Sequence, residues 1–68
     1  MKPLTAKQLE EILRANGFIK SHGVGSHQGW FNPQTNCRTV VPHHGNRVLP
    51  QGTLIAIFKQ AGLPKPNR

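Results

Sequence analysis

The chain has 68 residues, which is enough for one small domain and too few for a second domain or a deep substrate cavity. The chain contains nine Lys and Arg but only two acidic residues, which gives a formal net charge of +7. This excess favours an acidic partner, most often a nucleic acid, and makes a basic surface that is merely solvated the weaker interpretation. The single cysteine excludes an internal disulfide, and no apolar run approaches the ~20 residues that span a membrane. We also expect no signal peptide, because no apolar segment follows Lys2. We therefore expect a soluble, cytoplasmic protein.

The first element in chain order is a helix expected over residues 6–16. Thr5 is a suitable N-cap, and Gln8 stands at the position that completes a capping box. Three apolar residues follow at the spacing of one helical face, namely Leu9, Ile12 and Leu13. Gly17 is a suitable residue to end this helix.

Three short strands are expected next, at residues 18–22, 26–31 and 38–41. The first lacks a helical period and leads into a glycine-rich turn. The second ends in a turn that contains Asn and Pro, and the third is rich in β-branched residues and ends its pairing at Pro42. Short connections of this kind indicate an antiparallel meander.

The last element is a helix that Thr53 is expected to cap. Its buried face is formed by four residues at helical spacing, Leu54, Ile57, Phe58 and Ala61. Gly62 ends the helix, and the prolines that follow prevent its continuation. We therefore assign residues 1–63 to a single domain and residues 64–68 to a basic C-terminal tail.

The expected order α-β-β-β-α defines an α+β fold with a three-stranded antiparallel sheet. Each helix has only one apolar face, so both helices should cover the same face of the sheet and form two layers around one core. The other face of the sheet is then left open. On a strongly basic domain, an open sheet face is where a nucleic acid or a partner protein would lie.

His27 is the first candidate functional residue. Side chains alternate along a strand, so Trp30, the expected core anchor, and His27 should lie on opposite faces of the sheet. This alternation places His27 on the open face, and the small residues Gly25 and Ser26 before it leave room for a phosphate to approach. An accessible imidazole can take up or release a proton near neutral pH.

RNA cleavage needs little more than such a group, and this scheme requires no metal or cofactor. The ribose 2′-hydroxyl attacks the adjacent phosphorus once a base removes its proton, and cations stabilise the charge that develops on the phosphoryl oxygens. Lys20, Arg38 and Arg47 are the cations expected to lie near His27, with Ser26 as a hydrogen-bond donor to the RNA. The alternative is that His27 is only a surface hydrogen-bonding residue at a turn.

Three further histidines, His22, His43 and His44, are candidates for a second acid or base, unless one histidine serves both proton transfers through water. One of the pair His43 and His44 is also a candidate for a phosphate contact or for capping a loop. A zinc site is not expected, because the chain has no Cys-x-x-Cys or His-x-x-x-His spacing. Cys37 opens a strand and is expected to be a half-buried thiol without a catalytic role. The acidic residues, Glu10 and Glu11, lie in the first half of the first helix, where its dipole favours negative charge.

The chain resembles the HicA, or YcfA-like, toxin family of HicA–HicB toxin–antitoxin systems. Three segments carry the resemblance. The first runs from Gly17-Phe18 through Lys20 to Gly25-Ser26-His27, the second is Val40-Val41-Pro42-His43-His44, and the third runs from Leu49 through Gly52-Thr53-Leu54 to Lys59-Gln60-Ala61-Gly62-Leu63. Together with the first helix they cover about residues 4–63, and their order and spacing are specific as a set.

The resemblance implies a fold like that of double-stranded-RNA-binding domains and the activity of an mRNA interferase, an endoribonuclease that cuts mRNA independently of the ribosome and inhibits translation. It also implies that the histidine of the Gly-Ser-His motif, His27, is catalytic, and that a HicB antitoxin covers the toxin. The chain departs from the family pattern because no basic residue follows His27 before Arg38, and because His22-Gly23 stands where Arg or Lys is common.

Two other functions are compatible with these residues. The first is that of a non-catalytic RNA-binding module that keeps the fold and the charge. The second is that of a protein-interaction domain whose basic surface meets an acidic antitoxin. Loss of cleavage in a His27→Ala variant separates catalysis from binding alone. A strong salt dependence separates RNA binding from protein interaction, because phosphate contacts weaken as salt rises.

Overall fold

A computed structural model describes residues 2–43 and 45–64. The element order is α1 (Ala6–Ala15), β1 (Ile19–Lys20), β2 (His27–Asn32), β3 (Cys37–Pro42) and α2 (Gln51–Ala61), which confirms the expected α-β-β-β-α fold. Most of the expected basic tail lies outside the described residues, as does His44. Within the described part, neither helix is long and apolar enough to cross a membrane.

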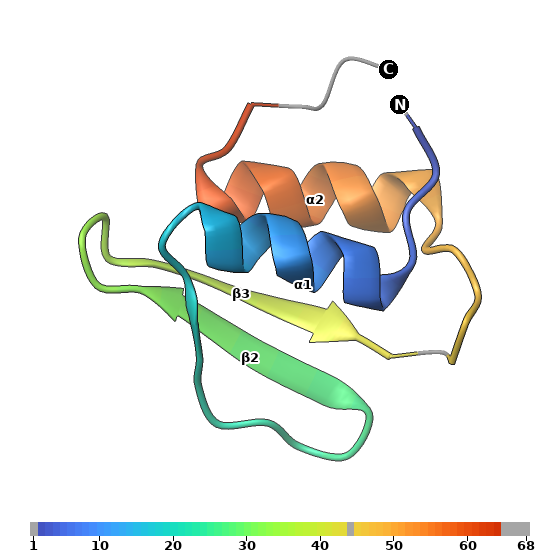
Figure 1. Ribbon diagram of the computed structural model, residues 1–68, viewed down its shortest axis with the longest axis horizontal. Coiled ribbons are helices and arrows are strands. Elements are labelled where there is room, and N and C mark those ends of the chain that lie inside the picture. Colours follow the sequence, from blue (N-terminus) through green and yellow to red (C-terminus); the bar gives the residue numbers. More distant parts are fainter. Residues whose placement is uncertain (1, 44, 65–68) are drawn as a thin grey trace.

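The strands form one antiparallel sheet in the order β1-β2-β3, and both helices lie on the same side of it (Figure 1). The register pairs Trp30 of β2 with Thr39 of β3, and all three of Trp30, Thr39 and Val41 are buried against the helices. Residues in between, such as Arg38 and Val40, are exposed on the opposite face. The two-layer arrangement with one open sheet face is therefore confirmed.

Helix α1 begins as the sequence predicts. The Thr5 side chain accepts a hydrogen bond from the Gln8 amide, and the Gln8 side chain accepts one from the Thr5 amide, so the capping box is complete. The helix ends at the C-cap Asn16, after which Gly17 adopts a φ of +93° that a side chain would disfavour. Both acids lie in this helix after its first turn, where the dipole acts less strongly, and Glu10 is buried on the inner face.

Helix α2 begins earlier than predicted. Its N-cap is Pro50, which provides no side-chain hydrogen bond, and the Pro50 carbonyl accepts the first helical bond from the Leu54 amide at 3.0 Å. The expected cap at Thr53 is wrong because Thr53 already lies inside the first turn. Gly62 ends the helix with a φ of +69°, as predicted.

One hydrophobic core lies between the helices and the sheet. Trp30 is its largest fully buried side chain, together with Phe18 and Phe58. The remaining buried apolar residues are Leu4, Ala6, Leu9, Leu13, Val41, Leu49, Leu54, Ile57 and Ala61. Every residue of the expected inner face of α2 is among them, whereas Ile55 is 37% exposed at the margin. The core therefore confirms Trp30 as the anchor of the sheet.

Strand β1 is shorter than predicted, because the chain after Lys20 bends across β2. The amide of Ser21 donates to the Gly29 carbonyl at 2.9 Å, and the chain then passes so close to Gly29 that it leaves no room for a side chain. A Cβ atom built at Gly29 would lie 2.5 Å from the His22 carbonyl oxygen. This close approach fixes the path of the β1–β2 connection.

We expect Gly29→Ala to destabilise the protein by about 1–3 kcal/mol, because the added methyl must displace the backbone at His22. Gly52→Ala is the matched control, since nothing lies within 4 Å of an added Cβ there and the position is helical. It should stabilise by about 0.4–1 kcal/mol. Urea denaturation measures both free energies of unfolding, and equal values for the two variants would contradict the crowding at Gly29.

Candidate functional site

A two-residue turn places His27 at the start of β2. The Val24 amide donates to the His27 carbonyl at 2.9 Å, and the His27 amide donates to the Val24 carbonyl at 3.0 Å. Gly25 and Ser26 form the turn between them, with a φ of +60° at Gly25. A glycine with positive φ at the first central position is typical of a type II′ hairpin turn. The Gly-Ser-His motif therefore forms a hairpin turn that fixes the backbone position of His27.

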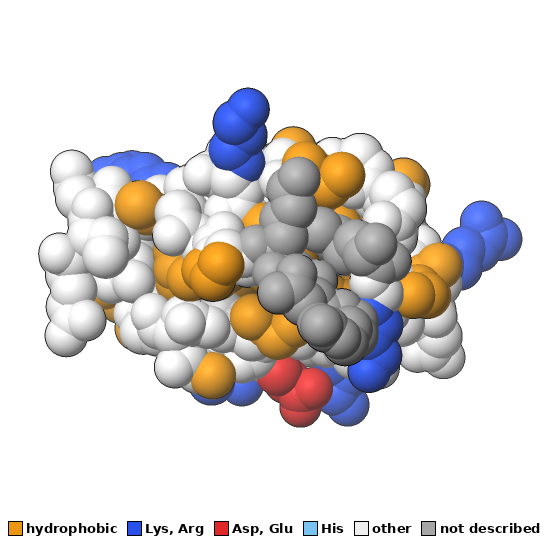
Figure 2. Space-filling model, turned by 90° about the horizontal axis from the view of Figure 1, so that it is seen from above, with side chains coloured by type: hydrophobic (Ala, Val, Ile, Leu, Met, Phe, Trp, Pro, Cys, Tyr) orange, Lys and Arg blue, Asp and Glu red, His pale blue; other side chains and the backbone are white. Residues whose placement is uncertain are grey.

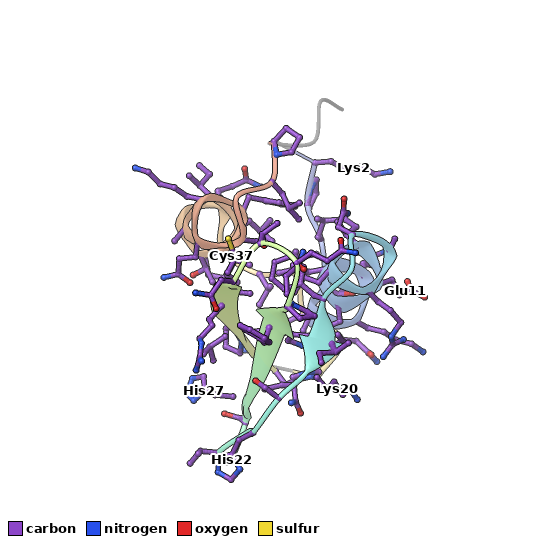
Figure 3. All side chains as sticks on the ribbon, turned by 90° about the vertical axis from the view of Figure 1, so that its left-hand side faces the viewer. Lys2, Glu11, Lys20, His22, His27 and Cys37 are labelled. Carbon is purple, nitrogen blue, oxygen red and sulfur yellow. The ribbon has the colours of Figure 1, made fainter. Side chains whose placement is uncertain are left out.

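His27 is exposed, and its strand register places it on the open face of the sheet. It pairs with Pro42 of β3. His27 lies three positions before the buried Trp30 in β2, so the two side chains point to opposite faces. Figure 3 shows the His27 side chain projecting away from β2 into solvent. The geometry leaves this imidazole free to meet a ligand.

An open cavity of about 250 Å³ lies where β2 begins and β3 ends. Its lining is mostly polar and glycine-rich, formed by Ser21, Gly23, Gly25, Ser26, His27, Gln28 and His43. The two strands are joined at this end by the His43 amide, which donates to the Ser26 carbonyl at 2.7 Å. The sheet therefore brings two of the candidate histidines, His27 and His43, to one cavity.

Gln28 fastens the loop that forms the wall of this cavity. Its side-chain amide donates to the Ser21 carbonyl at 2.7 Å and to the Gly29 carbonyl at 3.1 Å. The loop over residues 21–26 is thus tied to β2 by a side chain as well as by the Val24–His27 pairing. The wall is held in place before any ligand arrives, which lowers the entropic cost of binding.

The ring of His43 is held by a buried carboxylate. Its Nε2 lies 2.9 Å from Oε2 of Glu10 in α1, and the same oxygen accepts the indole N–H of Trp30 at 3.0 Å. An ionised carboxylate only accepts hydrogen bonds, so His43 donates from Nε2 and its Nδ1 is left for other partners. The Glu10 side chain is 12% exposed and that of His43 is 43% exposed. No local pattern signals this contact, because Glu10 and His43 are 33 positions apart in the sequence.

The sheet places two of the three cations predicted near His27, Lys20 and Arg38, at different positions relative to that residue. Lys20 pairs with Trp30 in the edge strand β1, and Figure 3 shows its side chain and that of His27 on opposite sides of β2. Arg38 shares the open face with His27 but pairs with Phe31, four positions further along β2. Its guanidinium lies 5.0 Å from the Phe31 ring. Only Arg38 therefore lies on the face of His27 within the sheet.

Two of the remaining candidates, Arg47 and His22, lie outside the cavity lining. Arg47 is exposed in the segment between β3 and α2. His22 is exposed in the loop before β2, although its two neighbours, Ser21 and Gly23, line the cavity. Ser26 is part of the lining. Across residues 2–43 and 45–64, no three His, Cys, Asp or Glu side chains gather as ligands for a metal ion. Cys37 is half-buried at the start of β3, and its thiol lies 3.8 Å from the Thr35 carbonyl oxygen.

The surface charge is predominantly positive. Every described Lys and Arg is exposed, whereas one of the two acids, Glu10, is buried. On the side seen in Figure 2, Lys and Arg side chains are spread around the edge and the acidic surface is a small patch among them. The described Lys and Arg side chains therefore present positive charge in several directions.

The family model for the HicA toxin of bacterial toxin–antitoxin systems matches residues 6–63. The match covers α1, all three strands and α2, and so includes the cavity and both of its histidines. No curated protein matches the chain.

We expect Trp30→Phe to destabilise the protein by about 1–3 kcal/mol, because the phenyl ring keeps most of the packing but leaves the buried Glu10 carboxylate without its indole donor. In a Glu10→Gln background the same substitution should cost less, since a neutral acceptor forms a weaker bond. A double-mutant cycle by urea denaturation measures the difference. Full additivity of the two substitutions would contradict a direct bond between these side chains.

Proposed function

Since the chain belongs to the HicA toxin family of bacterial toxin–antitoxin systems, we propose that it is an endoribonuclease that cleaves mRNA in the cytoplasm and thereby inhibits translation. The observation that carries this proposal is the exposed His27, held by a hairpin turn beside an open polar cavity on a chain with a net charge of +7. Positive charge attracts the RNA, and the imidazole supplies the proton transfer that cleavage needs.

The reaction uses the substrate's own nucleophile. His27 removes the proton from a ribose 2′-hydroxyl, and the 2′-oxygen then attacks the adjacent phosphorus. The bond from phosphorus to the 5′-oxygen breaks, and that oxygen takes up a proton. The products are a 2′,3′-cyclic phosphate and a 5′-hydroxyl end, so no step requires a metal or a cofactor. DNA lacks the 2′-hydroxyl and is not cleaved by this route.

The RNA backbone is held by groups at different distances from the cleaved phosphate. Ser26 lines the cavity, and its hydroxyl can donate to a phosphate oxygen there. Arg38 lies further along the open face, where it contacts a neighbouring part of the strand. Lys20 lies on the other side of β2 and acts on a more distant phosphate, and the exposed Arg47 adds positive charge after β3. This spread accounts for binding of an extended single strand better than for a compact anion.

The proposed protein partner is a HicB-type antitoxin that covers the cavity and keeps His27 from RNA. A toxin with an exposed catalytic imidazole needs such a cover when its activity is not required. The strongly basic surface favours an antitoxin with an acidic contact surface.

We expect His27→Ala to lower cleavage of a defined RNA by about 10²–10⁴-fold, because general acid–base catalysis contributes in that range. The assay is run in EDTA, with products separated on a denaturing gel. RNA affinity and the circular dichroism spectrum should be unchanged, since the side chain is exposed and makes no hydrogen bond within the described residues. Cleavage by His27→Ala at the rate of the parent would overturn the role of His27. RNA binding without cleavage by either protein would instead favour a non-catalytic binding module.

We expect the affinity of the His27→Ala variant for a non-cleaved RNA to fall more than tenfold between about 50 and 200 mM salt. Each phosphate contact contributes a slope of about −0.7 in a plot of log K against log salt, and three or four contacts are available. Fluorescence anisotropy at several salt concentrations measures this slope. A slope near zero would indicate that the basic surface serves an acidic protein partner and not RNA.

A further inference from the structure

We propose that His43 is the general acid of RNA cleavage and that the buried Glu10 carboxylate is its positioning residue. This inference rests on the proposed ribonuclease activity and deepens it, since a base at His27 accounts for only one of the two proton transfers. The observation behind it is that His43 lines the same cavity as His27 while its Nε2 is bound to Glu10 at 2.9 Å.

The contact with Glu10 suits His43 to carry a proton. A carboxylate that accepts from one ring nitrogen fixes the tautomer and the orientation of the imidazole. Glu10 is itself held by the indole N–H of Trp30, the anchor of the core, so the whole chain of bonds rests on a rigid part of the fold. With Nε2 occupied, the proton available to a substrate lies on Nδ1.

The arrangement at the end of the sheet fits the geometry of the reaction. His27 pairs with Pro42, so His43, the next residue, belongs to the opposite face of the sheet and reaches the cavity from the helix side. In a displacement at phosphorus the attacking and leaving oxygens lie roughly in line, on opposite sides of the phosphorus atom. A phosphodiester laid across this end of the sheet therefore has the base on one side and the acid on the other.

The proton balance is then complete. His27 takes the proton of the 2′-hydroxyl as the 2′-oxygen bonds to phosphorus, and His43 gives its Nδ1 proton to the 5′-oxygen as the bond to phosphorus breaks. His27 ends protonated and His43 neutral, and exchange with water restores both. Of the other candidates, His22 is exposed but does not line the cavity, and His44 lies outside the described residues.

A substrate with sulfur in place of the bridging 5′-oxygen tests the assignment, because a thiolate leaves without being protonated. On ordinary RNA, His43→Ala should lower the cleavage rate by about 10²–10⁴-fold. On the 5′-phosphorothiolate RNA, the cleavage rate of the His43→Ala variant should lie within about tenfold of that of the parent. His27→Ala should remain impaired on both substrates, since attack by the 2′-oxygen still needs a base. Glu10→Gln should show a smaller loss on ordinary RNA that the sulfur substrate also restores, whereas a purely structural role would lower both rates equally.

The outcomes separate this inference from the function on which it rests. If the parent cleaves both substrates and His43→Ala is equally slow on both, His43 is not the general acid. If His22→Ala and not His43→Ala is restored by sulfur, the acid is His22. If the parent cleaves neither substrate, the proposed ribonuclease activity fails together with the inference. Circular dichroism and thermal unfolding of each variant confirm that the rates refer to folded protein.

Discussion

The site depends most on the two hydrogen bonds that the Glu10 carboxylate accepts. This carboxylate lies between α1 and the sheet, where it accepts the indole N–H of Trp30 and the ring N–H of His43 through one oxygen. A buried charge is tolerated only when such partners replace water, so the core anchor, the helix and the end of β3 are held in one relative position. The burial also removes one of the two acids from the surface, which leaves the outside of the protein more strongly positive.

The second constraint is the tight connection before β2. The turn at Gly25 and Ser26 leaves His27 no freedom of backbone position, and the bonds from Gln28 hold the loop that faces it. The absence of a side chain at Gly29 allows the chain to pass across the strand at that point. A domain of this size has little core to spare for a deep pocket, and these local bonds build an open cavity at the end of the sheet instead.

Local patterns in the sequence predicted most of the fold. The capping box at Thr5, the glycines that end both helices and the alternation that buries Trp30 are all short-range signals, and all are confirmed. The cap at Thr53 failed because Pro50 starts the helix one turn earlier without any side-chain bond. The contact of Glu10 with His43 and the divergence of Lys20 from His27 depend on strand register and helix packing, which no local pattern specifies. The role of His27 itself stays a prediction.

The central claim is that the chain cleaves RNA by attack of the ribose 2′-oxygen, with histidines as the proton carriers. The most direct test is to incubate the purified protein, in EDTA, with an end-labelled RNA and with the same strand carrying a single 2′-deoxy sugar at the cleaved position, and to identify the product ends. The account predicts a 2′,3′-cyclic phosphate and a 5′-hydroxyl from the RNA and no cut at the deoxy position. Cleavage at the deoxy position, or products that end in a 5′-phosphate, would contradict it.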